Sequence, residues 1–202
     1  MRLAHREFGS GGEPLILLHG VFGSIANWAP IARRLGQGRR VIAADLRNHG
    51  RSPHHPEMTY PAMVADVLEL MEHLSLPQCD LLGHSMGGKV AMALALERPQ
   101  RLARLVVADM VPVAFPFHPS PVIEALRGLD LEGIGNRAEA DRALAEAIPD
   151  KRLRGFLLQN LVRRHGRYHW RVNLEALTRH TRDLAGFGPP FTDSVFTGPA
   201  LF

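Results

Sequence analysis

The pentapeptide Gly83-His84-Ser85-Met86-Gly87 is the feature that most constrains how this chain can fold. An apolar run predicts a strand over Cys79–Leu82 just before it, and a helix is predicted over Gly88–Arg98, ending before a proline. A strand that turns into a helix over so few residues needs a sharp turn, and the flanking glycines let the two elements pass close together. Ser85 is therefore expected to stand above a sheet edge as a candidate nucleophile.

Strand-like and helix-like segments alternate along the first 109 residues. Strands are predicted over Pro14–Leu18, Val41–Ala44 and Leu105–Ala108. Helices are predicted over Ile25–Leu35 and from Thr59 to about Leu74, where apolar residues recur at three- and four-residue spacing. Such alternation is typical of a mostly parallel sheet with helices on both faces. The predicted fold class is α/β, with residues 1–109 as its core.

The composition changes after Asp109. A proline-rich stretch over residues 110–122 excludes a continuing helix, and residues 137–184 are predicted to be helical with no strand between them. A helical insertion after a strand of a parallel sheet is typical of a lid, and residues 110–188 are assigned to it. Residues 189–202 are expected to return to the core, because Ala200–Phe202 resembles the start of another strand.

Composition narrows the classes of partner. The formal net charge is +4, but basic residues are scattered among carboxylates instead of forming one stripe, which disfavours nucleic acid. No apolar run approaches the roughly 20 residues of a membrane-spanning helix, so no membrane partner is expected. Cys79 is the only cysteine, which excludes an internal disulfide and predicts a reducing, cytoplasmic compartment.

A glycine-containing turn, His19–Gly23, follows the strand predicted at 14–18. Acyl transfer to a serine requires N–H donors for a developing oxyanion, and we predict Val21 and Met86 as the pair, the latter at a helix N-terminus. His19 is interpreted as a structural histidine that holds the loop. No metal is predicted, because Asp45 and His49 lack further ligands at suitable spacing, and no cofactor motif occurs.

Three motifs carry a family resemblance: His-Gly at 19–20, Asp-x-Arg-x-His-Gly-x-Ser at 45–52, and Gly-His-Ser-Met-Gly-Gly at 83–88. Their order and spacing resemble the α/β-hydrolase fold family over essentially the whole chain. Further residues make the chain resemble one branch of this family, the small intracellular serine esterases and acyl-thioesterases. These residues are Asn48, Lys89 and the segments 109–113 and 170–174. This resemblance implies hydrolysis of a carboxylic ester or thioester of a small acyl substrate through an acyl-enzyme.

The resemblance also implies roles for individual residues. Ser85 takes the nucleophile position, and Asp109 fits the triad acid of some members, with a loop-bracing or helix-capping aspartate as an equal alternative. Candidate substrate-binding residues are Phe22, His84 and Trp170. An acyl pocket is expected to be lined by the lid residues Phe115, Phe117, Phe156, Leu157 and Trp170.

The triad histidine is the missing part of the pattern. In the family it follows the last strand, and none of the 11 histidines occupies that position, although a lid histidine (His118, His165, His169 or His180) is a less favoured substitute. The last strands are therefore expected to be absent, which would impair activity and leave Leu105–Ala108 as an exposed edge prone to aggregation or dimerisation. A non-catalytic hydrolase-like binding protein and an inactive fragment remain alternatives, and the oligomeric state is left open.

Overall fold

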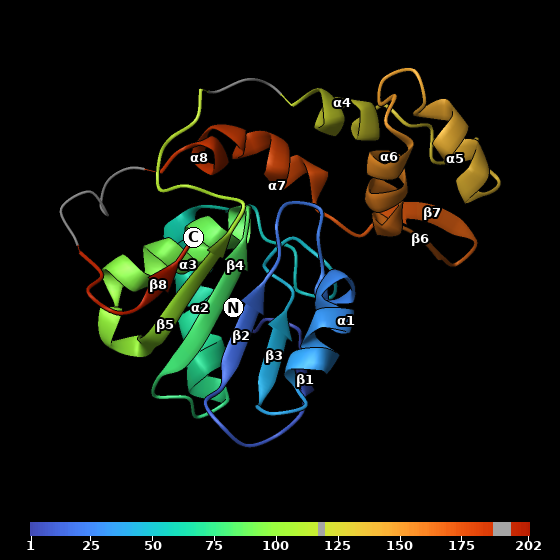
Figure 1. Cartoon of the computed structure of the whole chain (residues 1–202). Coiled ribbons are helices and arrows are strands. Elements are labelled where there is room, and N and C mark those ends of the chain that lie inside the picture. The colour runs from blue at the N-terminus through green and yellow to red at the C-terminus, as the bar shows by residue number, and fades with distance from the viewer. Residues whose placement is uncertain (117–119, 188–194) are drawn as a thin grey trace.

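A computed structural model describes residues 1–116, 120–187 and 195–202, and within them one six-stranded sheet forms the centre (Figure 1). The strand order is β1-β3-β2-β4-β5-β8, and every neighbouring pair is parallel except β1 with β3. The strands are β1 His5–Phe8, β2 Leu15–Leu18, β3 Val41–Ala44, β4 Cys79–His84, β5 Leu102–Ala108 and β8 Ala200–Leu201. The predicted α/β class with a mostly parallel sheet is confirmed.

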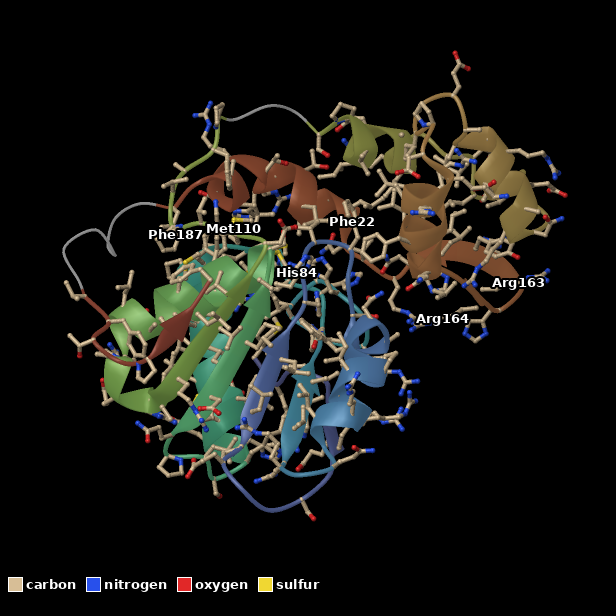
Figure 2. The ribbon with its side chains drawn as sticks, viewed as in Figure 1. Phe22, His84, Met110, Arg163, Arg164 and Phe187 are labelled. Atoms are coloured by element: carbon tan, nitrogen blue, oxygen red, sulfur yellow. The ribbon has the colours of Figure 1, made fainter. Side chains whose placement is uncertain are left out.

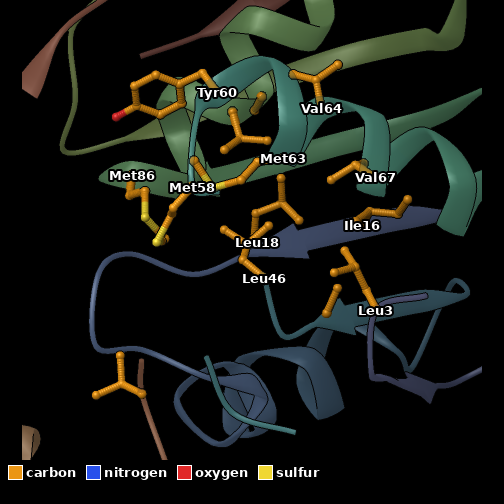
Figure 3. Packing of buried hydrophobic residues seen from close by; sticks show 14 of the residues in the cluster. Leu3, Ile16, Leu18, Leu46, Met58, Tyr60, Met63, Val64, Val67 and Met86 are labelled. Atoms are coloured by element: carbon orange, nitrogen blue, oxygen red, sulfur yellow. The ribbon is translucent and has the colours of Figure 1, made fainter. Parts of the chain in front are cut away.

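Three helices cover the two faces of the sheet: α1 Ile25–Leu35, α2 Tyr60–His73 and α3 Met86–Glu97. Side chains alternate along β2, so Leu15 and Leu17 join the small cluster under α1, and Ile16 and Leu18 join the large cluster under α2 and α3. Figure 3 shows Ile16 and Leu18 facing α2. Because both faces of the sheet are covered, every residue of β2 is apolar.

The predicted strands and helices of the core are present with small shifts. The helix expected over Ile25–Leu35 is found with these bounds, and Thr59 is the N-cap of α2, its hydroxyl accepting the N–H of Ala62. β4 extends two residues beyond its predicted end and α3 begins at Met86, so Ser85 alone separates them. The antiparallel edge strand β1 was not predicted, because only Phe8 of its four residues is buried.

A cap built from residues 121–185 lies over the carboxyl ends of the strands (Figure 1). Its elements are α4 Pro121–Arg127, α5 Arg137–Ala143, α6 Lys151–Leu157, β6 Leu161–Arg164, β7 Arg167–Trp170, α7 Leu174–Arg179 and α8 Thr181–Ala185. The prediction that residues 137–184 contain no strand is wrong, since β6 and β7 form an antiparallel hairpin. His165 and Gly166 at its tip both have positive φ, as a two-residue hairpin turn requires.

The cap is fastened to the core by a buried lysine. The Lys89 ammonium on α3 donates to the carbonyls of Ala185 and Gly186 at 2.9 and 2.8 Å, and it lies 4.6 Å from the centre of the Phe115 ring. The carboxyl end of a helix carries partial negative charge, which a cation stabilises. Burial nevertheless lowers the pKa of Lys89 to about 8, because the charged form loses hydration.

The outer edge of β5 is covered over Leu105 and Val106. β8 pairs with it in parallel, Leu105 opposite Ala200, and the Leu105 N–H donates to the carbonyl of Pro199 at 3.0 Å. The expectation of an exposed Leu105–Ala108 edge is therefore wrong for its first two residues, and the strand expected at 200–202 is found as Ala200–Leu201. Aggregation or dimerisation stays a prediction. Within the described ranges, no helix is long and apolar enough to cross a bilayer.

A buried ion pair holds the loop that follows β3. The Arg47 guanidinium donates to both carboxylate oxygens of Asp66 on α2, at 2.6 and 2.9 Å, and both side chains are almost fully buried. Two further donations, to the carbonyls of Glu57 and Ala62, leave the guanidinium well satisfied. Bidentate, buried pairing of this kind fixes the loop against α2.

We therefore expect Asp66→Ala to lower the free energy of unfolding by about 3–5 kcal/mol, because it leaves the Arg47 charge buried without its partner. The control is Glu72→Ala on the same helix, whose exposed carboxylate lies 3.8 Å from Arg101 and should contribute less than about 1 kcal/mol. Urea denaturation of both variants measures the difference. Equal, small losses would contradict a structural role for the buried pair.

Candidate active site

Ser85 lies at a strained turn between β4 and α3. Its φ of 51° and ψ of −118° fall outside the regions that non-glycine residues favour. A Cβ atom at Gly83 would lie 2.1 Å from the carbonyl oxygen of Gly87, and one at Gly87 would lie 2.5 Å from that of Leu18. The two glycines are therefore required by backbone packing, as the sequence pattern predicts.

Asp109 lies beside the turn because of the strand register. His84 of β4 is opposite Ala108 of β5, and the Ser85 N–H donates to the Ala108 carbonyl at 3.0 Å. Ser85 and Asp109 are thus the residues that follow two paired positions, and Asp109 too has positive φ, 55°. Its carboxylate is 89% exposed and lies 3.8 Å from His84 Nε2, which leaves it free to receive another donor.

The turn after β2 packs directly against Ser85. A Cβ atom at Gly20 would lie 3.0 Å from the Cβ of Ser85 and from His84 Nδ1, so any larger residue would have to push these side chains aside. The Gly23 N–H closes the turn on the Gly20 carbonyl at 2.9 Å. Asn160 of the cap donates to the Phe22 carbonyl at 2.8 Å. Figure 2 shows Phe22 and His84 beneath the cap, above the carboxyl ends of the strands.

Val21 and Met86, the predicted oxyanion donors, lie in this turn and at the first position of α3. Neither N–H makes a hydrogen bond within the described residues. A free N–H at a helix N-terminus carries partial positive charge, which suits a developing oxyanion. Their position leaves both donors available for that role, which stays a prediction.

Backbone strain gathers around this edge of the sheet. Phe22, Asn48, Ser85 and Asp109 all have positive φ and lie in the turns that follow β2, β3, β4 and β5. Conformations of this kind cost about 1–3 kcal/mol each and persist where the surroundings impose them. Strain at four adjacent strand ends marks this edge as the candidate functional site.

A cavity of about 370 Å³ opens beside Ser85, within the size range of small-molecule sites. Its lining consists of His19, Gly20, Val21, Gly23, Asn27, Trp28, Ile31, His84, Ser85 and Phe156. His84, predicted to bind substrate, and Phe156, predicted to line an acyl pocket, are both part of this lining. Their roles stay predictions.

The other predicted pocket residues lie elsewhere. Trp170 is on β7, where its indole N–H donates to the Leu126 carbonyl at 3.0 Å, and Leu157 is fully buried in the core. Phe115 packs on the Lys89 ammonium, and Phe22 is half-buried against the main core. Phe117 lies outside the described residues. Aromatic residues in a lid are as often packing as lining, which the sequence pattern does not distinguish.

His19 and His49 form a buried scaffold under the turns. His19 Nε2 accepts the Leu46 N–H at 3.0 Å, so its Nδ1 carries the proton and donates to the Gly20 carbonyl at 2.8 Å. The His49 ring centre lies 5.1 Å from that of His19. Burial lowers the pKa of His19 to about 4 and that of His49 to about 3. Both are neutral at pH 7, and His19 has no free nitrogen to act as a base.

Ser85 Oγ has no hydrogen-bond partner in the part of the chain that the structure describes. Among the lid histidines, His165 is at the exposed hairpin tip, His169 is on β7, and His180 pairs with Asp183 at 2.7 Å. None of these lines the cavity, and His118 lies outside the described residues. The described contacts therefore supply no base for Ser85.

Asp45 braces the neighbouring loop. Its two carboxylate oxygens accept the N–H groups of Ile25 and Arg51, at 2.6 and 2.8 Å. A Cβ atom at Gly50 would lie 2.1 Å from the same carboxyl group, which explains the glycine at this position. Over residues 1–116, 120–187 and 195–202, no group of three His, Cys, Asp or Glu side chains could hold a metal ion.

The buried histidines make stability depend on pH. In the unfolded chain a histidine titrates near 6.5, so the unfolded state binds more protons than the folded state between about pH 6.5 and 4. We therefore expect the free energy of unfolding to decrease as the pH is lowered from about 6.5 to 4. The loss should be smaller in His49→Asn, which keeps a donor for the Arg47 carbonyl. Urea titrations at several pH values measure both slopes, and equal slopes would contradict this account.

Comparison with known proteins agrees with this architecture. A family model described as the alpha/beta hydrolase fold matches residues 13–186. A solved structure, a marine microorganism esterase, superposes with a TM-score of 0.95 and 35% identity, covering 100% of this chain and 79% of its own. Sheet, serine turn and helical cap define a hydrolase-type α/β protein, and the chain belongs to the α/β-hydrolase fold family.

Curated relatives carry lipase and esterase names. The sn-1-specific diacylglycerol lipase ABHD11 of Xenopus tropicalis is 45% identical over 203 residues, covering 95% of this chain and 62% of the relative. Esterase YbfF of Escherichia coli is 32% identical over 176 residues, covering 87% of this chain and 68% of the relative. The chain therefore spans less than two thirds of the frog lipase.

Proposed function

We propose that this chain is part of a serine hydrolase that cleaves carboxylic ester bonds of small acyl substrates through an acyl-enzyme. The observation that carries the proposal is the strained Ser85 turn, which faces a cavity of about 370 Å³ beside two unused N–H donors. A chain that only bound a ligand would not need a nucleophile in a costly backbone conformation. The esterase and lipase names of the relatives support the same class.

The reaction assigns one step to each group. Ser85 Oγ attacks the acyl carbonyl while a histidine base takes its proton, and the Val21 and Met86 N–H groups hold the oxyanion. The protonated base then gives its proton to the leaving alcohol, and the acyl group stays on Ser85. Water attacks this acyl-enzyme by the same path, which releases the acid and frees the serine.

Asp109 is proposed as the acid that orients the base. Its exposed carboxylate at the end of β5 lies next to the serine turn, with room for an imidazole that the described contacts do not provide. The base would therefore come from outside the described residues, and impaired activity of the 202-residue chain belongs to the proposal. A hydrolase-like binding protein is the second candidate, favoured by the absence of any partner for Ser85 Oγ within the described residues.

The proposed substrate is a small apolar acyl ester, and thioesters are included because the leaving group is not specified by the site. Val21, Trp28, Ile31 and Phe156 give the cavity an apolar lining suited to an acyl chain. Comparing an ester and a thioester of the same acyl group tests the leaving group directly. A cytoplasmic location stays a prediction from the single cysteine.

The first test compares hydrolysis of p-nitrophenyl butyrate by the wild-type chain and by Ser85→Ala. We expect saturable turnover that the variant loses, by up to about 10⁶-fold in kcat where a base is fully in place and by less where it is not. Trapped acyl groups on Ser85, found by mass spectrometry, would supply independent support. Equal rates in the two proteins would contradict catalysis by Ser85 and favour the binding protein.

The second test separates two roles of Asp109. Asn tolerates the left-handed backbone conformation, so Asp109→Asn removes the charge without adding strain. If Asp109 orients a catalytic base, the Ser85-dependent kcat should fall with little change in KM, by up to about 10⁴-fold where that base is fully in place. If Asp109 only braces its loop, the variant should lose stability and keep the Ser85-dependent rate. The control is Glu132→Gln, an exposed residue of the cap.

A further inference from the structure

A second cavity, of about 420 Å³, lies on the other side of α1 from the Ser85 cavity. Its lining consists of Ala4, His5, Arg6, Ser24, Ile25, Ala26, Ala29, Asp45, Arg51 and Arg171. The residues come from β1, the start of α1, the loop after β3 and the segment that follows β7. The volume falls within the range of small-molecule sites.

The two cavities use opposite faces of one helix. Successive residues of an α-helix are about 100° apart. Ile25, Ala26 and Ala29 therefore share one face, which lines the second cavity, whereas Trp28 and Ile31 share the opposite face, which lines the Ser85 cavity. A molecule in one cavity is separated from the other by the body of α1, so the second cavity is a distinct site.

The second cavity has an excess of positive charge. Arg6, Arg51 and Arg171 line it, and none of these guanidinium groups forms an ion pair within the described residues. Asp45 is the one carboxylate in the described lining, and its two oxygens already accept backbone N–H groups. Three cations against one anion leave a net charge of about +2 facing the cavity.

Two other arginines show how this chain neutralises a guanidinium group that it buries. The nearly buried guanidinium groups of Arg47 and Arg154 each pair with a carboxylate, Asp66 and Asp141 respectively. The cavity arginines form no ion pair within the described residues, although Arg171 acts electrostatically on Asp45 and the Arg6 guanidinium lies 5.0 Å from the centre of the Phe8 ring. Guanidinium groups bind phosphate and carboxylate oxygens through paired N–H bonds, and a dianion would balance the charge of this cavity.

We propose that this cavity is a binding site for a small soluble phosphate compound, held by Arg6, Arg51 and Arg171. The phosphate group carries close to two negative charges and three acceptor oxygens, which suits an excess of two positive charges supplied by three different segments of the chain. The backbone of Arg171 is held in place on both sides, because its N–H donates to the Asn160 carbonyl and its carbonyl accepts from His54, both at 2.8 Å. The site does not depend on Ser85.

The ligand would tie the cap to the core. Arg171 belongs to the cap segment, whereas Arg6 is on β1 and Arg51 follows the loop braced by Asp45. Asn160, which anchors Arg171, also donates to the Phe22 carbonyl in the turn that faces Ser85. A phosphate bridging these segments would therefore stabilise the folded protein, and the stabilisation would grow with the logarithm of its concentration above Kd.

The test measures binding of pyrophosphate by calorimetry and by thermal shift, with ionic strength held constant by sodium chloride. The wild-type chain should bind it saturably, and Arg51→Ala and Arg171→Ala should each weaken binding at least tenfold. Arg142→Ala, an exposed arginine of α5 outside the cavity lining, is the matched control and should bind like the wild type. Circular dichroism without ligand verifies that each variant is folded.

Two further measurements distinguish a separate site from the Ser85 cavity. Ser85→Ala should bind pyrophosphate with unchanged affinity, and pyrophosphate should not compete with p-nitrophenyl butyrate. Competition with the ester would place the phosphate in the Ser85 cavity and overturn the proposal. It would equally be overturned by equal affinity in wild type, Arg51→Ala and Arg171→Ala, or by the absence of saturable binding up to about 10 mM, where specific recognition becomes negligible.

Discussion

The close contact between β4, α3 and β2 is the constraint on which the rest of this structure depends. Backbone atoms of Gly83, Gly87 and Leu18 approach so closely that a single added methyl group would collide with a carbonyl. That contact forces the chain to reverse through Ser85 alone, and it holds the serine in a strained conformation. The reactive position is thus a consequence of packing at the sheet, and it survives because the large core beneath it is fully formed.

Parallel pairing then brings the remaining groups to the same edge. Each strand that runs beside β4 delivers its following turn there: Gly20 touches Ser85 from β2, and Asp109 follows β5. The turns are supported from below by neutral, buried histidines and by the Asp45 carboxylate, all of which bind backbone groups. Asp45 does not line the Ser85 cavity. The edge is therefore held in place by many hydrogen bonds before any substrate arrives.

Sequence reasoning was most reliable where burial is complete. β2 and β3 are apolar throughout because both faces of the sheet are covered. The serine turn could be predicted because only glycine fits at positions 83 and 87. β1 was missed because an edge strand with one buried residue has no such pattern. The hairpin β6–β7 was missed because its signal is a two-residue turn at 165–166, a local cue inside a region that otherwise reads as helical. Which lid residues line the cavity depends on packing between distant segments, which spacing along the chain does not encode.

Helix α1 lies between the two cavities and also contacts the cap. One face of the helix borders the Ser85 cavity and the other borders the arginine-lined cavity, while Asn27 at its start reaches Gln159 of the cap at 3.2 Å. Lys89 fixes the opposite end of the cap to α3 through two carbonyls. The cap is thus attached to the core at several places, which also include Asn160 on the Phe22 carbonyl and His54 on the Arg171 carbonyl. In the proposed phosphate site, the charge excess near α1 would add one more attachment when an anion binds. An anion at that position would form this attachment without entering the space in front of Ser85.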